Sequence, residues 1–181
     1  MIPLSRTKTS NDTLGIFVEF EHERRWYGYD VLLYHEVVND TIGNTHFAIT
    51  YCPLCGSALV FDRTQSDTVH EFGVSGWLFE SNMLMYDKAT ESLWSQAGAR
   101  AIVGEYNSIE LKMLPLQVLS LAQVKSGYSD TLILSRETGH ENRLYGYNPY
   151  GNYDEREEII YPVSYEAVSY THLTLPTNRE V

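Results

Sequence analysis

Residues 37–61 read VVNDTIGNTHFAITYCPLCGSALVF, and this stretch decides the fold that the sequence predicts. Val37–Asp40 is an extended run, and Thr41–Asn44 has the residues of a hairpin turn leading into a strand at Thr45–Cys52. We therefore expect these two strands to pair antiparallel.

Side chains alternate between the two faces of a strand, so the strand at Thr45–Cys52 divides into two sets. One set is Phe47, Ile49 and Tyr51, and the other is His46, Ala48, Thr50 and Cys52. Because the first set carries the larger apolar side chains, we expect it to be the more buried one.

The rest of the chain has the same character: short runs rich in aromatic and β-branched residues lie between turn residues. Strands are expected at Ile16–Glu21 and Thr131–Leu134, with hairpins pairing Leu59–Phe61 with Val69–Val74 and Met83–Tyr86 with Ser92–Ser95. Short helices are expected at Val31–His35 and Leu119–Lys125. The predicted fold class is α+β and β-dominated, an antiparallel meander of hairpins with one or two short helices.

The two ends of the chain differ from this pattern. Residues 1–14 are interpreted as a flexible N-terminal segment and residues 15–167 as a single β-rich domain that is cut short at its C-terminus. Val168–Thr177 reads VSYTHLTLPT, which matches one translated frame of an adapter used in sequencing libraries. We therefore interpret residues 168–181 as a non-native tail and exclude them from the fold.

Charge and hydropathy restrict the partners. The 181 residues carry 13 Lys+Arg against 24 Asp+Glu, a formal net charge of −11, which disfavours binding to the phosphate backbone of nucleic acids and docking on anionic membranes. No apolar run approaches the ~20 residues of a membrane-spanning helix. The expected partner is a small molecule or a metal ion.

Both cysteines lie in the motif Cys52-Pro53-Leu54-Cys55-Gly56. A two-residue gap lets both sulfurs converge on a metal ion or on each other, so three interpretations stay open. In the first, the thiolates bind zinc or copper with His35 or His46 as a further ligand. In the second, they are a redox pair, although such pairs begin a helix in thioredoxin-like folds and residues 57–62 read as a strand. In the third, they are a buried thiol pair or a structural disulfide.

A second cluster, His35-Glu36 followed by Asn39-Asp40, places a base, two carboxylates and an amide within six residues. Glu36 and Asp40 are candidate proton carriers for a catalytic site. The alternative is a corner whose polar groups satisfy nearby backbone donors, in a non-catalytic binding or structural module.

The ordered motifs resemble the bacterial and archaeal domain-of-unknown-function family 3179. The resemblance rests on His35–Asp40, Thr50–Gly56, Phe61-Asp62-Arg63, Phe72–Gly76, Ser81-Asn82, Met85-Tyr86-Asp87, Ser92–Gln96, Leu134–Gly139 and Asn148-Pro149-Tyr150, and it covers about Gly15 to Asp154. Members often carry export signals or lipoprotein anchors, so the resemblance implies an extracytoplasmic setting. It implies no particular activity. Trp77, Phe79 and Glu80 depart from the residues more usual in the family, which could alter the wall of a pocket.

Overall fold

The structure is a computed structural model and describes residues 1–65, 67–140 and 142–151. It confirms the β-dominated α+β class. The helical segments are short: the 3-10 helix η1 at Leu4–Arg6, α1 at Tyr29–His35 and α2 at Leu121–Gly127. The strands are β1 Ile2–Pro3, β2 Leu14–Phe20, β3 Glu23–Gly28, β4 Val37–Ile42, β5 Thr45–Cys52, β6 Ser57–Asp62, β7 Thr64–Gln65, β8 Thr68–Val69, β9 Phe72–Phe79, β10 Asn82–Asp87, β11 Leu93–Ser95, β12 Arg100–Val103, β13 Gln117–Ser120 and β14 Leu132–Ile133.

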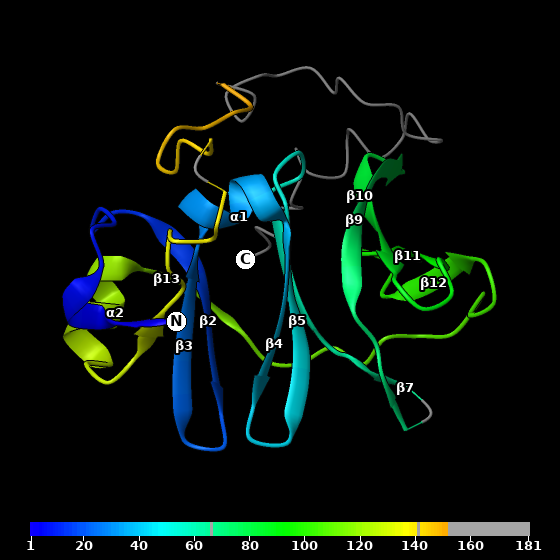
Figure 1. The fold of residues 1–181 in the computed structure, drawn as a ribbon, viewed down its shortest axis with the longest axis horizontal. Coiled ribbons are helices and arrows are strands. Elements are labelled where there is room, and N and C mark those ends of the chain that lie inside the picture. Colours follow the sequence, from blue (N-terminus) through cyan, green and yellow to red (C-terminus); the bar gives the residue numbers. More distant parts are fainter. Residues whose placement is uncertain (66, 141, 152–181) are drawn as a thin grey trace, which may run out of the picture.

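Three sheets stand side by side (Figure 1). A five-stranded sheet has the order β1-β14-β3-β2-β13, a three-stranded sheet has the order β4-β5-β6, and a four-stranded sheet has the order β12-β11-β10-β9. The pairing is antiparallel except between β14 and β3, which run parallel. The short pair β7 and β8 is separate from these sheets.

The predicted hairpin of β4 and β5 is confirmed, with Val37 opposite Thr50 and Ile42 opposite Thr45. The predicted difference between the faces of β5 is wrong, because Ala48 and Thr50 are as fully buried as Phe47 and Ile49. One face packs with β2 and β3, and the other packs with β10 and β11. The middle sheet therefore lies between two cores, and alternation in sequence does not separate an inner face from an outer one.

Two other predictions need correction. The segment Leu59–Phe61 pairs with β5 and not with Val69–Val74, because the four-residue turn after Cys52 folds β6 directly back onto β5. The helix expected from Leu119 begins at Leu121, since Ser120 and Gln123 form a reciprocal capping box that fixes the first turn. The hairpin of β10 with β11 is confirmed.

The ends of the chain bear on the predicted domain limits. Within residues 1–14, expected to be flexible, β1 pairs with β14, and Ile2 and Leu4 pack against a buried cluster around Phe17 and Trp26. The predicted boundary at residue 167 and the predicted tail lie outside the described residues. Neither α1 nor α2 has the length or hydropathy to cross a bilayer, nor has any other helix in the described part of the chain.

Candidate functional site

The two cysteines lie at the end of the β5–β6 hairpin. Cys52 is the last residue of β5 and stands opposite Ser57, the first residue of β6, so the turn returns Cys55 to the side of Cys52. Both are free thiols; Cys52 is buried and Cys55 is exposed. This arrangement gives the two sulfurs different environments, one enclosed and one open to a reaction partner.

Polar groups surround the sulfur of Cys55, and the amide of Asn82 donates to it. The hydroxyl of Ser57, which also contacts the sulfur, donates to Oε1 of Gln96 at 2.7 Å. The Asn82 side-chain nitrogen Nδ2 lies 3.1 Å from the sulfur of Cys55, and the hydroxyl of Ser57 lies 3.0 Å from it. The Cys52 thiol also donates to it. Asn82 comes from β10, so the site joins the middle sheet to the four-stranded one.

Backbone groups fix the orientation of the amides at this site. The N–H of Ala97 donates to Oδ1 of Asn82 at 2.9 Å, which leaves Nδ2 pointing to the sulfur. Nε2 of Gln96 donates to the backbone carbonyl of Ser57, and Oε1 of Gln96 accepts from Asn82 at 2.8 Å. Gln96 is fully buried and Asn82 nearly so. Because a backbone N–H can only donate and a carbonyl can only accept, these contacts determine which side-chain atom is nitrogen.

The hydrogen bonds separate the acidities of the two thiols. The hydrogen bond with Cys52, and then those with Ser57 and Asn82, outweigh burial and lower the pKa of Cys55 to about 5. The same bond to Cys55, together with burial, raises the pKa of Cys52 well above its ordinary value. The network therefore favours the charged form at the exposed sulfur of Cys55 and the protonated form at the buried sulfur of Cys52.

A cavity of about 280 Å³ opens beside Cys52. Its described lining residues are Glu36, Cys52, Pro53, Leu54, Val74, Gly76, Trp77, Leu78, Met83 and Tyr150. They come from the end of α1, the cysteine turn, β9, β10 and the segment before residue 151. The cavity thus brings Glu36, one of the two candidate carboxylates, to the same space as Cys52.

Glu36 is placed by the end of α1. Its N–H donates to the carbonyl of Leu32, and its own carbonyl accepts from the N–H of Tyr51 at 2.8 Å, next to Cys52. Its φ of 55° is unusual for a residue other than glycine. Burial raises the pKa of Glu36, which the hydrogen bond from the hydroxyl of Tyr150 partly opposes. The carboxylate is therefore a better proton acceptor than an exposed one.

The histidines predicted as metal ligands have other partners. Nε2 of His35 lies 2.6 Å from the hydroxyl of Tyr145, and the ring lies 5.3 Å from that of His140. Burial, His140 and Arg143 lower the pKa of His35. His46 contacts Thr41 through Nδ1 and lies six positions before Cys52 in β5, roughly 20 Å along an extended strand.

The predicted ligand set is therefore not assembled. Within residues 1–65, 67–140 and 142–151, no three His, Cys, Asp or Glu side chains are grouped to hold a metal ion. The sequence prediction failed at His35 because α1 ends before the strand begins, and the loop around Tyr145 supplies a closer partner than the sulfurs.

Asp40, the second candidate proton carrier, lies away from the cysteines. It stands opposite Phe47 in the hairpin. Phe47 lies five positions before Cys52 in β5, which is roughly 17 Å along the strand. Asp40 accepts from the hydroxyl of Tyr27 at 2.7 Å and pairs with Arg25. Burial alone would raise the pKa of Asp40, but these hydrogen bonds outweigh it and hold the pKa below its ordinary value.

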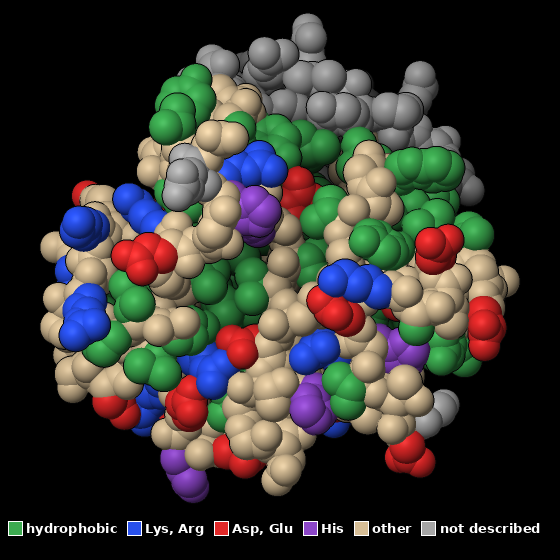
Figure 2. Space-filling model, viewed as in Figure 1, with side chains coloured by type: hydrophobic (Ala, Val, Ile, Leu, Met, Phe, Trp, Pro, Cys, Tyr) green, Lys and Arg blue, Asp and Glu red, His purple; other side chains and the backbone are tan. Residues whose placement is uncertain are grey.

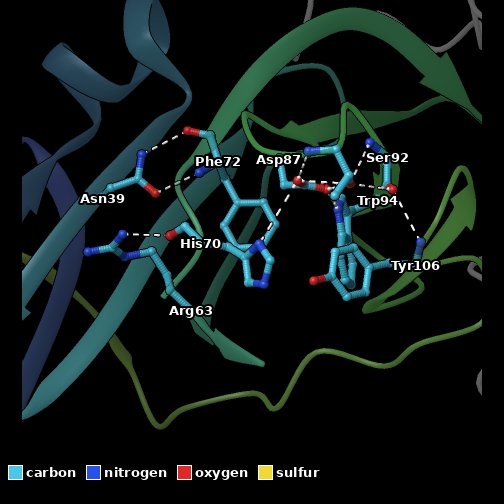
Figure 3. A network of polar contacts seen from close by, with 9 residues as sticks. Asn39, Arg63, His70, Phe72, Asp87, Ser92, Trp94 and Tyr106 are labelled. Atoms are coloured by element: carbon cyan, nitrogen blue, oxygen red, sulfur yellow. Dashed lines mark hydrogen bonds and ion pairs between the residues drawn. The ribbon is translucent and has the colours of Figure 1, made fainter. Parts of the chain in front are cut away.

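A second buried polar network holds the start of β9 against the rest of the domain (Figure 3). Asn39 bonds both backbone groups of Phe72, at 2.9 and 2.7 Å. Asp87, fully buried, accepts from the indole of Trp94 at 3.0 Å and lies 3.9 Å from the ring of His70. These contacts join the start of β9 to β4 and the end of β10 to β11.

Sequence reasoning missed Ser57, Asn82 and Gln96 as site residues. They lie 2, 27 and 41 positions after Cys55. Nothing local in the sequence predicts that Ser57 and Asn82 contact its sulfur or that Gln96 bonds to both of them. Asn82 and Gln96 do fall within two of the short motifs that carry the family resemblance.

Comparison with known proteins supports that resemblance. A family model described as a protein of unknown function, DUF3179, matches residues 3–175, so the chain belongs to this family. No curated protein and no solved structure was found to match the chain.

Proposed function

We propose that this member of the family is a thiol–disulfide exchange protein in which Cys55 attacks and Cys52 resolves. The observation that carries the proposal is the Asn82 amide N–H aimed at the exposed sulfur of Cys55, beside a buried partner thiol. Hydrogen bonds to a charged sulfur stabilise the thiolate, which is the form that attacks a disulfide.

The reaction has two steps. The Cys55 thiolate attacks one sulfur of a substrate disulfide, forming a mixed disulfide and releasing the other substrate sulfur as a thiolate. Cys52 then loses its proton and attacks the sulfur of Cys55, which forms the Cys52–Cys55 disulfide and releases the second substrate thiolate. Two electrons pass from the protein to the substrate, and an external dithiol returns the protein to its reduced form.

Glu36 is the proposed proton acceptor for the second step. Cys52 is buried and holds its proton firmly, so resolution requires a base in the same space. Glu36 lines the cavity that Cys52 lines, and burial raises its affinity for a proton. The proton then leaves through the open side of the cavity with the substrate thiolate.

The local structure accounts for thiolate stabilisation without a helix. In thioredoxin-like folds the reactive pair begins a helix, whereas here a strand, β6, follows the pair. The side chain of Asn82 supplies a donor of the kind that a helix N-terminus would otherwise supply. An extracytoplasmic setting, expected from the family resemblance, would suit this chemistry.

The test compares two single variants. Reduced Cys52→Ser protein, mixed with a small aromatic disulfide, is expected to accumulate a mixed disulfide on Cys55, identified by mass spectrometry. Reduced Cys55→Ser protein is expected to react at the slow rate of a buried, protonated thiol. Equal reactivity of the two variants, or an unreactive Cys55, contradicts the proposal.

Metal analysis separates this function from the metal-binding interpretation. Reduced protein purified without chelators is expected to contain less than stoichiometric zinc or copper. Stoichiometric metal lost in both cysteine variants would favour a thiolate metal site instead.

A further inference from the structure

Exposed apolar side chains gather along the C-terminal half of β9, next to the cysteine turn. Val74, Trp77, Leu78 and Phe79 have exposed fractions of 40%, 66%, 37% and 45%, and we call them the β9 surface. Hydrophobic side chains cover the ends of β9 and β10 in the space-filling view (Figure 2). Such a gathering on one short hairpin marks a place where another apolar group binds.

A bulge in β9 turns these residues toward the cysteines. Val74 pairs with Met85 and Leu78 with Met83, so the three residues between them face Leu84 alone. The hydroxyl of Ser75 donates to the carbonyl of Leu84 at 2.6 Å and accepts from the N–H of Trp77 at 3.1 Å.

Gly76 completes the bulge with a φ of +77°, a conformation that side chains disfavour. In a regular strand, adjacent residues point to opposite faces. Here Gly76, Trp77 and Leu78, which are consecutive, all line the cavity that contains Cys52. The bulge therefore places an apolar wall beside the reactive pair.

The size and charge of the cavity restrict what binds there. A volume of about 280 Å³ falls at the lower limit of small-ligand pockets, which span about 300–1,000 Å³. It suits one or two side chains better than a large cofactor. Among the described lining residues Glu36 is the one that carries a formal charge, and the chain has a net charge of −11, so an anionic disulfide such as oxidised glutathione is disfavoured.

The strand itself offers a second mode of recognition. β9 is at the edge of its sheet and pairs with β10 on one side. An edge strand presents backbone groups to an extended segment, while neighbouring pockets select its side chains.

We propose that the β9 surface binds an extended, neutral or basic protein segment that carries the substrate disulfide, with an apolar side chain in the cavity. This rests on the proposed exchange function and names its substrate class: a disulfide in a polypeptide and not a small anionic disulfide. The apolar side chain lies against Trp77 and Leu78, and the disulfide faces Cys55. The attack and resolution steps are those described above.

Tryptophan fluorescence measures the binding step apart from the chemistry. Of the three tryptophans, Trp26 and Trp94 are buried and Trp77 is 66% exposed, so a change in accessibility reports on the β9 surface. The Cys52→Ser/Cys55→Ser variant is titrated with a tryptophan-free cyclic disulfide peptide that carries Leu, Phe and Lys. We expect a blue shift and protection from acrylamide quenching, with neither change from oxidised glutathione or from a matched peptide in which Glu replaces Leu and Phe.

Turnover by the protein with both cysteines supplies the second measurement, with dithiothreitol as the external dithiol. Trp77→Ser is expected to raise the KM for the basic peptide about tenfold or more, as the loss of an interfacial Trp typically does. The loss of kcat/KM should be larger for the basic peptide than for a small neutral disulfide. Val118→Ser is the matched control, because Val118 is also an exposed residue on an edge strand, in the five-stranded sheet.

The outcomes distinguish peptide binding at the β9 surface from thiol–disulfide exchange by the two cysteines. Peptide binding to the cysteine-free variant without turnover by the intact protein would support the surface and contradict the exchange function. Turnover that Trp77→Ser leaves unchanged, or equal preference for oxidised glutathione, would overturn the proposed substrate class and leave the exchange function standing. A blue shift that depends on protein concentration without peptide would assign the surface to a second copy of the chain and overturn the proposal.

Discussion

Asn82→Ala tests how the thiolate of Cys55 is stabilised. The substitution removes the side-chain N–H that lies 3.1 Å from the sulfur and leaves the contact with Ser57 in place. A hydrogen bond to a charged group contributes about 1.5–3 kcal/mol, and one pKa unit corresponds to about 1.4 kcal/mol. We therefore expect the pKa of Cys55 to rise by about one to two units.

The assay follows the thiolate directly. Ultraviolet absorbance of the reduced protein and the rate of iodoacetamide alkylation at Cys55, located by mass spectrometry, are both measured against pH. Asn39→Ala is the matched control, because it removes an amide whose hydrogen bonds go to the backbone of Phe72 and not to the sulfur. Asn39→Ala should lower the free energy of unfolding and leave the pKa of Cys55 unchanged.

Two outcomes would refute the role of the Asn82 amide. An Asn82→Ala protein that is folded, by circular dichroism, and whose Cys55 titrates as in the unaltered protein would show that the amide does not stabilise the thiolate. An equal rise of the Cys55 pKa in Asn39→Ala would show that the pKa responds to any loss of stability.

Three further predictions concern the base, the pH dependence and the core. Glu36→Gln should leave alkylation of Cys55 unchanged but slow the release of substrate, so that the mixed disulfide accumulates in stopped reactions; rapid release would remove Glu36 from the mechanism. Because the folded-state pKa of Cys55 is lowered from 9.0 to about 5, its contribution to the stability of the reduced protein is full above pH 9 and is lost as pH falls toward 5. Urea unfolding should therefore show the reduced protein gaining stability over Cys55→Ser as pH rises through that window, and a constant difference would contradict the lowered pKa. Arg63 is buried and donates to the carbonyls of Phe47, His70 and Asp40, so Arg63→Leu should lower the free energy of unfolding by about 3 kcal/mol or more; a loss below about 1 kcal/mol would mean that these contacts contribute little.

Local pattern in the sequence predicts much of this fold. The turn at Gly43-Asn44 and the alternation around it predict the β4–β5 hairpin, and the short gap after Cys52 predicts that the two cysteines lie together. Both features depend on residues near one another in the chain. The prediction for the faces of β5 failed because burial on both sides depends on how sheets stack, which the strand's own sequence does not encode.

The site was predicted in part for the same reason. The cysteine pair and Glu36 are recognisable from residue type and spacing. The side chains that contact the sulfur of Cys55 come from β6 and β10, and the approach of Asn82 depends on the packing of two sheets. His35 illustrates the converse: it is close to the cysteines in sequence, but its ring is bonded to Tyr145.

The bond from Asn82 to Cys55 has a consequence for the order of events in the proposed exchange reaction. Asn82 directly follows the two-residue turn of the β9–β10 hairpin, where Glu80 and Ser81 have φ values of 50° and 59° that are strained for these residues. In the reduced protein the charged sulfur helps to hold this end of the hairpin. Formation of the Cys52–Cys55 disulfide would convert that sulfur into a weak acceptor, so the hairpin that carries Trp77 would gain freedom once the electrons have been transferred. Product release would then follow oxidation without a separate trigger, and amide hydrogen exchange at the tip of the hairpin should be faster in the oxidised protein than in the reduced one.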